Sequence, residues 1–372
     1  MLPFKMITAS YRLAARLEPE KCEQIIKALG IKRSTILDYV YPNNVKLAAA
    51  QMRLTSYKDL SAFIEECCRI LDEAVKSGSH LVLFPHLVGA LPLTAEKHAG
   101  SIAAQFIRDA VEGKASAAAL RQRFEQMIDK FSDFLFDCSY NIFLLLAHKY
   151  NIYIATGGLY ISTADGILCR SYLFSPDQQE AFFQDKIHLS PLEQQLGVKA
   201  GDEMKVLNLK IGKTAILAET DSLYYECFKV AKALGAEILL CPSLTGEALP
   251  GYADYNPALQ HAQHFNVYTA RASFCSAEDL LPAFQGASGI YAPLALSKDL
   301  DGIVAAAESG RPSVTAARID PPKLAENMDV YSLNPGAGLC ETMVGELYPA
   351  LLKKAPPAPA SGKAKPAKKG AR

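Results

Sequence analysis

The sequence has no long hydrophobic run. Apolar runs such as residues 143–147 and 81–84 are far shorter than the roughly 18 residues that a membrane span needs. The N-terminus also lacks the continuous apolar core of a signal peptide. Half of the residues are hydrophobic and 21% are charged, which is typical of a protein with a substantial core. We therefore expect a soluble, cytoplasmic protein, and at 372 residues one large domain with appendages is as plausible as two domains.

The chain also lacks an excess of charge of either sign, but this balance hides an asymmetry. Residues 353–372 hold seven of the 39 basic residues and no acidic one, so the rest has 32 basic and 39 acidic residues, a net charge of −7. Such a body does not attract nucleic acid by bulk charge, although the basic tail can contact any polyanion non-specifically. We therefore expect neither a nucleic-acid nor a membrane partner beyond that contact.

Paired cysteines and cofactor motifs are missing as well. The nine cysteines show no CxxC spacing and lie mostly in apolar surroundings, which favours reduced thiols over disulfides or a zinc site. There is no glycine-rich loop of the kind that holds phosphate groups and no evident cluster of metal ligands. The sequence thus predicts no metal and no cofactor.

What is present divides the chain into four parts. Residues 1–43 read as an N-terminal extension of short helices around Gly30, which faintly resembles a helix-turn-helix but is far more typical of plain packing helices. Residues 44–325 form the main domain, with a helical insert at 97–137. We expect 326–352 to pack on that domain or on a partner, and 353–372, rich in Pro, Ala and Lys, to be a disordered tail.

The main domain alternates apolar strands with amphipathic helices. This alternation indicates an α/β protein in which helices cover buried sheets. Strands are expected at 45–51, 80–84, 152–158, 168–174, 206–211, 215–218, 238–241 and 267–271, and helices at 59–77, through most of 97–148, and at 222–234 and 257–265.

Three polar segments follow strands of this domain, where ligands of α/β proteins gather. They contain His86, Lys186 with Glu193, and Glu219 with Asp221. In order and spacing they resemble the nitrilase, or carbon-nitrogen hydrolase, superfamily. The matching segments are Ala50-Gln51 ending the first strand, GSHLVLFPH at 78–86, KIHLSPLE at 186–193, ETDSLYYE at 219–226, LGAEILLCPS at 234–243 and GASGIYAP at 286–293.

The resemblance implies a fold and a catalytic triad. The fold would be a four-layer α-β-β-α sandwich of two mixed sheets with outer helices, and the family generally forms homodimers or larger assemblies. The family hydrolyses non-peptide carbon-nitrogen bonds with a cysteine nucleophile, a glutamate base and a lysine that stabilises negative charge. Only Lys186 matches, because His86 stands at the glutamate position and Glu219 at the cysteine position.

These replacements favour a catalytically impaired homologue, a pseudoenzyme. A carboxylate is a far poorer nucleophile than a thiolate, and an acyl product on Glu219 would be an anhydride. The fold would also bring Glu219 against Lys186, leaving the lysine occupied when a substrate oxyanion arrives. Such a protein would bind a small amide or carboxylate ligand, or a protein partner, in the former active site.

The alternative is a working amidase or nitrilase with a rearranged catalytic set. Its base would be His86 or Glu193, and its displaced nucleophile Cys241, Cys227 or Thr220, although both cysteines also fit as small core residues.

Three further residues enter the predicted pocket. The resemblance places Glu193 there, and Cys241 is expected there because it ends the next strand. Asp221, together with Glu226, also reads as a cap of the following turn and helix. The insert at 97–137 follows the His86 strand, so we expect it to cover the pocket or form an interface.

Overall fold

The structure is a computed structural model of the chain, and it describes residues 2–244, 256–276, 286–308 and 310–331. The predicted tail at 353–372 and all but the start of the predicted segment 326–352 lie outside these ranges. Among the described residues, no helix combines the length and the apolar character that crossing a bilayer requires.

Within the described residues, twelve strands form two mixed groups that join through the pairing of β1 with β9. In the first group β1, β2 and β3 run parallel, while β4, β5 and β12 add antiparallel pairs. In the second, β7, β8 and β9 run parallel, with β6, β10 and β11 antiparallel. The first group is β1 (Val45–Arg53), β2 (Leu81–Leu83), β3 (Tyr153–Thr163), β4 (Gly166–Phe174), β5 (Phe182–Asp185) and β12 (Ser313–Ile319). The second is β6 (Leu207–Leu209), β7 (Gly212–Ile216), β8 (Ile238–Pro242), β9 (Tyr268–Ser276), β10 (Gly289–Tyr291) and β11 (Ile303–Ala306).

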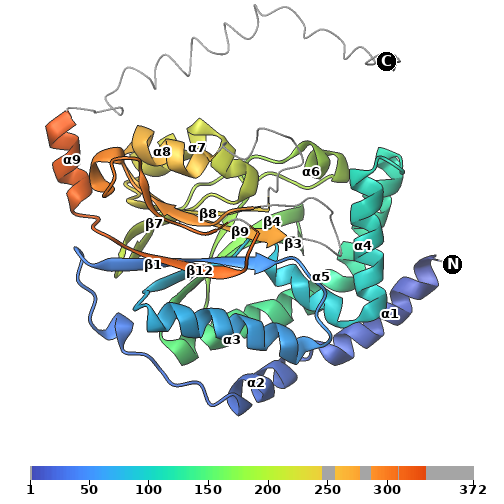
Figure 1. The fold of residues 1–372 in the computed structure, drawn as a ribbon. Helices are drawn as coiled ribbons and strands as arrows, with labels where there is room; N and C mark the ends of the chain where they lie inside the picture. The colour runs from blue at the N-terminus through green and yellow to red at the C-terminus, as the bar shows by residue number, and fades with distance from the viewer. Residues whose placement is uncertain (1, 245–255, 277–285, 309, 332–372) are drawn as a thin grey trace, which may run out of the picture. The chain divides into compact units, whose positions relative to one another are not determined.

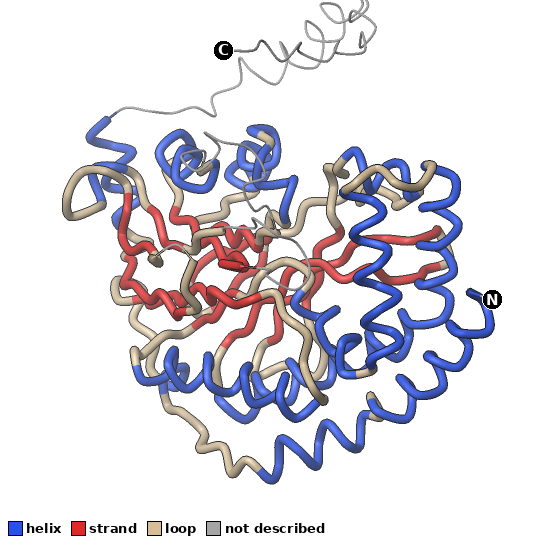
Figure 2. Tube along the Cα trace, turned by 45° about the vertical axis from the view of Figure 1, so that its right-hand side comes forward, coloured by secondary structure: helices blue, strands red, loops and turns tan. Residues whose placement is uncertain are grey.

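Helices cover the outer face of each group. The helices of the described residues are α1 (Leu2–Arg16), α2 (Pro19–Ala28), α3 (Leu60–Lys76), α4 (Lys97–Val111), α5 (Ala117–Tyr150), α6 (Pro191–Leu196), α7 (Tyr225–Ala233), α8 (Pro257–Phe265) and α9 (Lys323–Tyr331). Short 3-10 helices are η1 (Ile36–Asp38), η2 (Val88–Ala95), η3 (Glu219–Leu223) and η4 (Leu294–Leu296). Figure 1 shows α3 and α5 on one side of the strands and α7 and α8 on the other, and Figure 2 shows the same flanking helices after a turn of the view.

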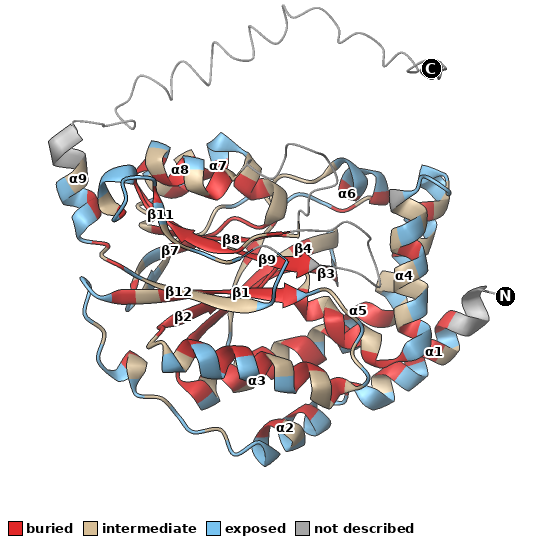
Figure 3. Cartoon of the chain, in the orientation of Figure 1, coloured by how far each residue is buried: buried red, intermediate tan, exposed pale blue. Residues whose placement is uncertain are grey.

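The alternation of side chains along each strand builds these layers. In β1, Leu47 packs in a core between the two strand groups, whereas Ala48 packs with the helices α3 and α5. In β8, Leu240 joins the same inner core, and Leu239 packs with α7 and α8. Successive strand residues point to opposite faces, so one strand serves two layers. In Figure 3 the strands are mostly coloured as buried and lie between helices that carry exposed residues, and the four-layer α-β-β-α arrangement predicted from the sequence is confirmed.

The parallel strands carry the predicted site residues at their carboxyl ends. β2 ends just before His86, β7 just before Glu219, and β8 contains Cys241 near its end. β1 pairs with β9 through residues 51–53 at its own carboxyl end, which links the two groups at the same edge. The topology therefore brings these segments together from distant parts of the chain.

The N-terminal extension differs from the helix-turn-helix that the sequence faintly resembled. After α2 the chain forms only the single 3-10 turn η1, so a second helix is missing from this part of the described chain. α2 also buries Cys22 and Ile26 in the core that contains α3 and α5. The extension is a set of packing helices.

Candidate active site

The centre of the site is the ammonium group of Lys186, which lies just after β5. Its Nζ donates hydrogen bonds to Glu193 Oε2 at 2.7 Å and to Glu219 Oε2 at 3.0 Å. The lysine side chain is only 1% exposed. Burial alone would lower the pKa of Lys186, but Glu219 and the other nearby groups outweigh it and raise that pKa above its usual value. Lys186 is therefore a charged, buried residue between two carboxylates, and the expected contact with Glu219 is present.

The carboxylate of Glu193 accepts hydrogen bonds from the protein at both of its oxygens. It is the third residue of α6, where it forms a capping box with Ser190 and its Oε2 accepts the backbone N–H of Ser190 at 2.7 Å. Its other oxygen, Oε1, accepts the hydroxyl of Tyr160 at 3.0 Å. Both oxygens of this buried carboxylate are thus engaged by protein donors, an arrangement that positions Lys186.

Glu219 sits at a sharp turn between β7 and η3. Its φ of 53° lies in the left-handed region, which costs a non-glycine residue roughly 1–2 kcal/mol. The Ser222 hydroxyl donates to the Glu219 carbonyl at 2.6 Å and closes the turn. The Glu219 side chain is 12% exposed, whereas that of Lys186 is 1% and that of Glu193 is 4% exposed. Glu219 is therefore the most accessible of the three charged groups.

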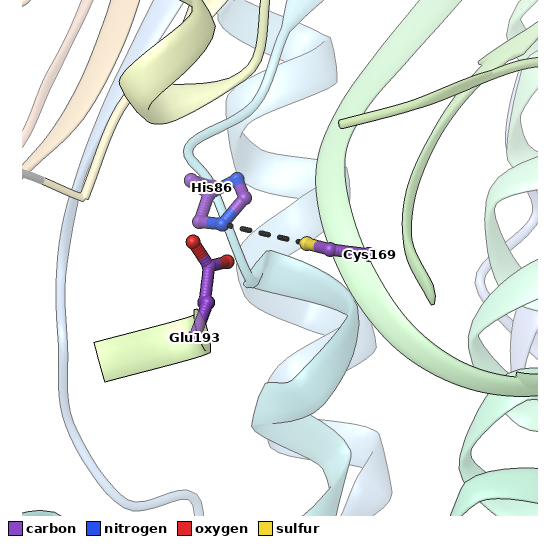
Figure 4. Close-up of side chains that lie close together, drawn as sticks. All are labelled: His86, Cys169 and Glu193. Atoms are coloured by element: carbon purple, nitrogen blue, oxygen red, sulfur yellow. Dashed lines mark hydrogen bonds between the residues drawn. The ribbon is translucent and has the colours of Figure 1, made fainter. Parts of the chain in front are cut away.

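His86 is buried, with its ring packed beside β3 and β4 (Figure 4). The backbone N–H of Gly158 donates to Nδ1 at 3.1 Å, so Nδ1 carries no proton and the neutral ring carries its proton on Nε2. Burial, reinforced by Lys186, lowers the pKa of His86 well below its ordinary value. The ring is neutral at pH 7, and its Nε2 is a donor rather than a base.

Two glycines make room for the backbone and the ring of His86. A Cβ on Gly157 would lie 2.3 Å from the His86 Cα, and one on Gly158 would lie 2.6 Å from its Cε1 and 2.4 Å from Cys169 Sγ. These glycines occupy the irregularity in the pairing of β3 with β4, between Thr156 and Leu159. The irregular part of β3 therefore lies where the strand passes closest to His86.

His86, Cys169 and Glu193 converge closely enough to suggest a metal, since their ligand atoms lie within 4.8 Å of one another. A metal on Nε2 of His86 would require a proton on Nδ1, and that nitrogen already accepts from Gly158. The hydrogen bonds of this trio therefore do not suit metal binding.

Asp221 and Cys241 lie near these residues but have other surroundings. The Asp221 carboxylate accepts the backbone N–H groups of Ile187 and His188, with the shortest contact at 2.6 Å. It thus ties the segment after Lys186 to the Glu219 turn, and the prediction that it caps the following turn and helix is wrong. Cys241 packs in the apolar core beneath α7 and α8, where burial raises the pKa of its thiol to about 12.

Sequence reasoning missed Tyr160, Cys169 and Gly158. Tyr160 and Cys169 sit mid-strand in β3 and β4 among other apolar residues, so no local pattern distinguishes them. The adjacent pair Gly157-Gly158 inside a predicted strand was the available signal, since glycine there marks a bulge or a close approach.

The insert at 97–137 packs beside these same residues. Phe106 stacks on Phe124 with ring centroids 6.0 Å apart, and Phe124 meets Tyr160 edge-on at 5.1 Å. Both phenylalanines share an apolar cluster with Cys169 and Leu196. The insert therefore supports the strand whose tyrosine holds Glu193.

The sequence matches a family of known enzymes over most of its length. The sequence profile described as "Carbon-nitrogen hydrolase" matches residues 46–324. A curated relative, "Probable hydrolase YhcX" of Bacillus subtilis (strain 168), is 29% identical over 169 residues, 44% of this chain. That match spans 33% of the relative's own length.

Solved structures share the fold at low sequence identity. A carbon-nitrogen hydrolase from Helicobacter pylori G27 has a TM-score of 0.59 and 18% identity, covering 84% of this chain and 99% of its own. Nit3 of Saccharomyces cerevisiae, from the nitrilase superfamily, has a TM-score of 0.56 and 17% identity, covering 78% and 96%. A mutant amidase of Nesterenkonia AN1 has a TM-score of 0.53 and 15% identity, covering 77% and 95%. With the profile match over most of its length, the chain belongs to the carbon-nitrogen hydrolase family.

Proposed function

We propose that this protein is a catalytically impaired carbon-nitrogen hydrolase homologue whose former active site binds a small ligand bearing an amine or amide N–H. The observation that carries the proposal is the Lys186 ammonium held between Glu193 and Glu219. Catalysis by the family scheme needs that cation for negative charge developing on the substrate. Here two carboxylates already neutralise it.

The charge balance of this trio also indicates the ligand. One ammonium and two carboxylates carry a net charge of −1, so an incoming carboxylate would be repelled. An amine or amide N–H suits the site better, because Glu219 is the most exposed of the three and Lys186 occupies only its Oε2. The net charge of the trio thus disfavours the carboxylate ligands that were also expected from the sequence.

The remaining groups give little support to hydrolysis with a rearranged catalytic set. As a base, His86 would need Nε2 without a proton, and that tautomer would lose the Gly158 hydrogen bond. The thiols of Cys241 and Cys227 are buried, and burial raises the pKa of both. Neither is a thiolate at neutral pH, so neither is activated for attack.

The first test is ammonia release from a panel of amides, nitriles and carbamoylated compounds. We expect none from the unmodified chain or from Lys186→Ala. The double substitution His86→Glu with Glu219→Cys restores the family's residue types, and covalent acylation of its new thiol would support the proposal. Turnover by the unmodified chain that disappears in Lys186→Ala would overturn it.

A second test addresses the ligand itself. Ethylamine, acetamide and acetate are similar in size, and calorimetric titration should detect binding of the first two but not of acetate. Glu219→Gln should remove the preference for the amine, while Glu226→Gln, an exposed carboxylate on α7, should leave it unchanged. Equal or tighter binding of acetate would contradict the proposed charge selection.

A further inference from the structure

A second cluster of potential ligands lies outside the trio of Lys186, Glu193 and Glu219. It consists of His188, Asp221 and Cys227, which come from the segment after β5, from η3 and from α7. Cys227 Sγ lies 3.2 Å from His188 Nδ1 and 3.9 Å from Asp221 Oδ1. His188 Nδ1 lies 3.4 Å from the same Asp221 oxygen. Three different ligand types therefore converge on one point.

The spacing of these atoms corresponds to a tetrahedral zinc site. Bonds of roughly 2.3 Å to sulfur and 2.0–2.2 Å to nitrogen and oxygen place tetrahedral ligand atoms about 3.3–3.7 Å apart. The three separations in the cluster, 3.2, 3.4 and 3.9 Å, bracket that range. Displacements of a few tenths of an ångström would complete the geometry.

A catalytic Cys-His-Asp arrangement would look different. There the thiol contacts one imidazole nitrogen, and the carboxylate holds the other. In this cluster the same Nδ1 faces both the thiol and the carboxylate, so the ring cannot pass a proton between them. Convergence on a single nitrogen is what a shared cation requires.

The surroundings of each ligand fit the same role. Asp221 is oriented by the backbone N–H groups of Ile187 and His188, as ligating carboxylates usually are. The His188 ring stacks on Tyr224 with centroids 4.0 Å apart, which fixes its plane. Its side chain is 29% exposed, so solvent reaches the cluster on the histidine side while Asp221 and Cys227 remain buried.

We propose that His188 Nδ1, the Asp221 carboxylate and Cys227 Sγ bind Zn²⁺, with a fourth position open to water. As the sulfur–zinc bond forms, the Cys227 thiol releases its proton to solvent. Burial and the adjacent Asp221 raise the pKa of this thiol, so that proton is still bound at neutral pH in the metal-free protein. His188 lies two residues after Lys186 and Asp221 two residues after Glu219, so the ion would brace the two segments that carry the ion pair.

The test uses the full-length chain, stripped with a chelator and titrated with Co²⁺ as a spectroscopic probe. Cobalt at this site should give a thiolate-to-metal charge-transfer band and the strong visible bands of tetrahedral coordination, and Zn²⁺ should displace both. Zn²⁺ should also raise the unfolding temperature, because it binds only the folded state.

Three variants test whether the cobalt charge-transfer band comes from the proposed ligands. Cys227→Ser should abolish the charge-transfer band. His188→Gln, at a partly exposed position, should weaken binding by more than the 10- to 100-fold that loss of an outer-shell partner costs. Cys241→Ser removes a different buried thiol, outside the cluster, and should keep the band. Absence of the band in the unmodified chain, or its persistence in Cys227→Ser, would overturn the proposal.

Discussion

Lys186 carries its charge where solvent scarcely reaches it, and its two carboxylate partners make this possible. A buried ion pair stabilises a protein little more than apolar side chains of similar volume would. Removing only one partner, however, leaves an uncompensated charge in the interior. The sequence predicted one of these partners, Glu219, from the position of the family nucleophile. It also pointed to Glu193, but the hydroxyl of Tyr160 that completes the network is a tertiary contact with no local signal.

We predict that Lys186→Met lowers the free energy of unfolding by about 3–5 kcal/mol, because it leaves Glu193 and Glu219 without a counter-charge. Adding Glu219→Gln should recover part of that loss. Urea denaturation measures both, with the exposed Lys298→Met as a control expected to change stability by less than about 0.5 kcal/mol. A loss from Lys186→Met no larger than that of the control would show that the carboxylates do not depend on the lysine.

The other residue that decides the chemistry is His86, whose role could not be read from the sequence. Its position predicted a possible base, since free histidine titrates near neutral pH. The structure gives its Nδ1 a backbone donor from a strand 72 residues further along the chain. Only the folded chain brings that donor into place, so the tautomer follows from tertiary structure.

Among the elements, β3 shows how one strand adapts to the site. Most strands were predictable from apolar alternation, whereas β11 and β12 were missed because their residues are mainly half-buried or exposed and give a weak pattern. Apolar alternation also predicted β3, but it gave no role to Gly157 and Gly158 within that strand. Their backbone lies so close to His86 and Cys169 that no side chain fits there.

We predict that Gly158→Ala destabilises the protein by about 1–3 kcal/mol or more, because its Cβ would overlap Cys169 and His86. The matched control is Gly89→Ala in η2, another buried glycine, where the nearest atom to a new Cβ lies at an ordinary 3.5 Å. Urea denaturation of the two variants should separate them clearly. Equal stability would mean that β3 yields without disturbing His86.

The cluster of His188, Asp221 and Cys227 was also beyond sequence reasoning, which predicted no metal. Zinc sites are recognised in sequences by short spacings such as CxxC. Here the ligands lie 33 and six residues apart on three different elements. Only the packing of the segment after β5 against η3 and α7 makes them neighbours.

At the scale of the whole molecule, the family profile begins at residue 46, but the hydrophobic core begins earlier. Leu13 and Leu17 of α1 and Cys22 and Ile26 of α2 belong to the same cluster as Phe63 and the strand residues beneath it. The sequence predicted short helices in this extension without showing what they cover. Their apolar faces complete the outer layer over α5.

It follows that the extension and the family domain should unfold as one unit. Leu13 is fully buried, so Leu13→Ala should lower the free energy of unfolding by about 2–5 kcal/mol, as in any well-packed core. Tyr11→Ala, at a neighbouring position that is 76% exposed, should change it by less than about 0.5 kcal/mol. In both variants, circular dichroism and native-state hydrogen exchange of β1 should report a single transition. If Leu13→Ala instead produced a separate, earlier transition confined to residues 1–43, the extension would be an appendage rather than part of the core.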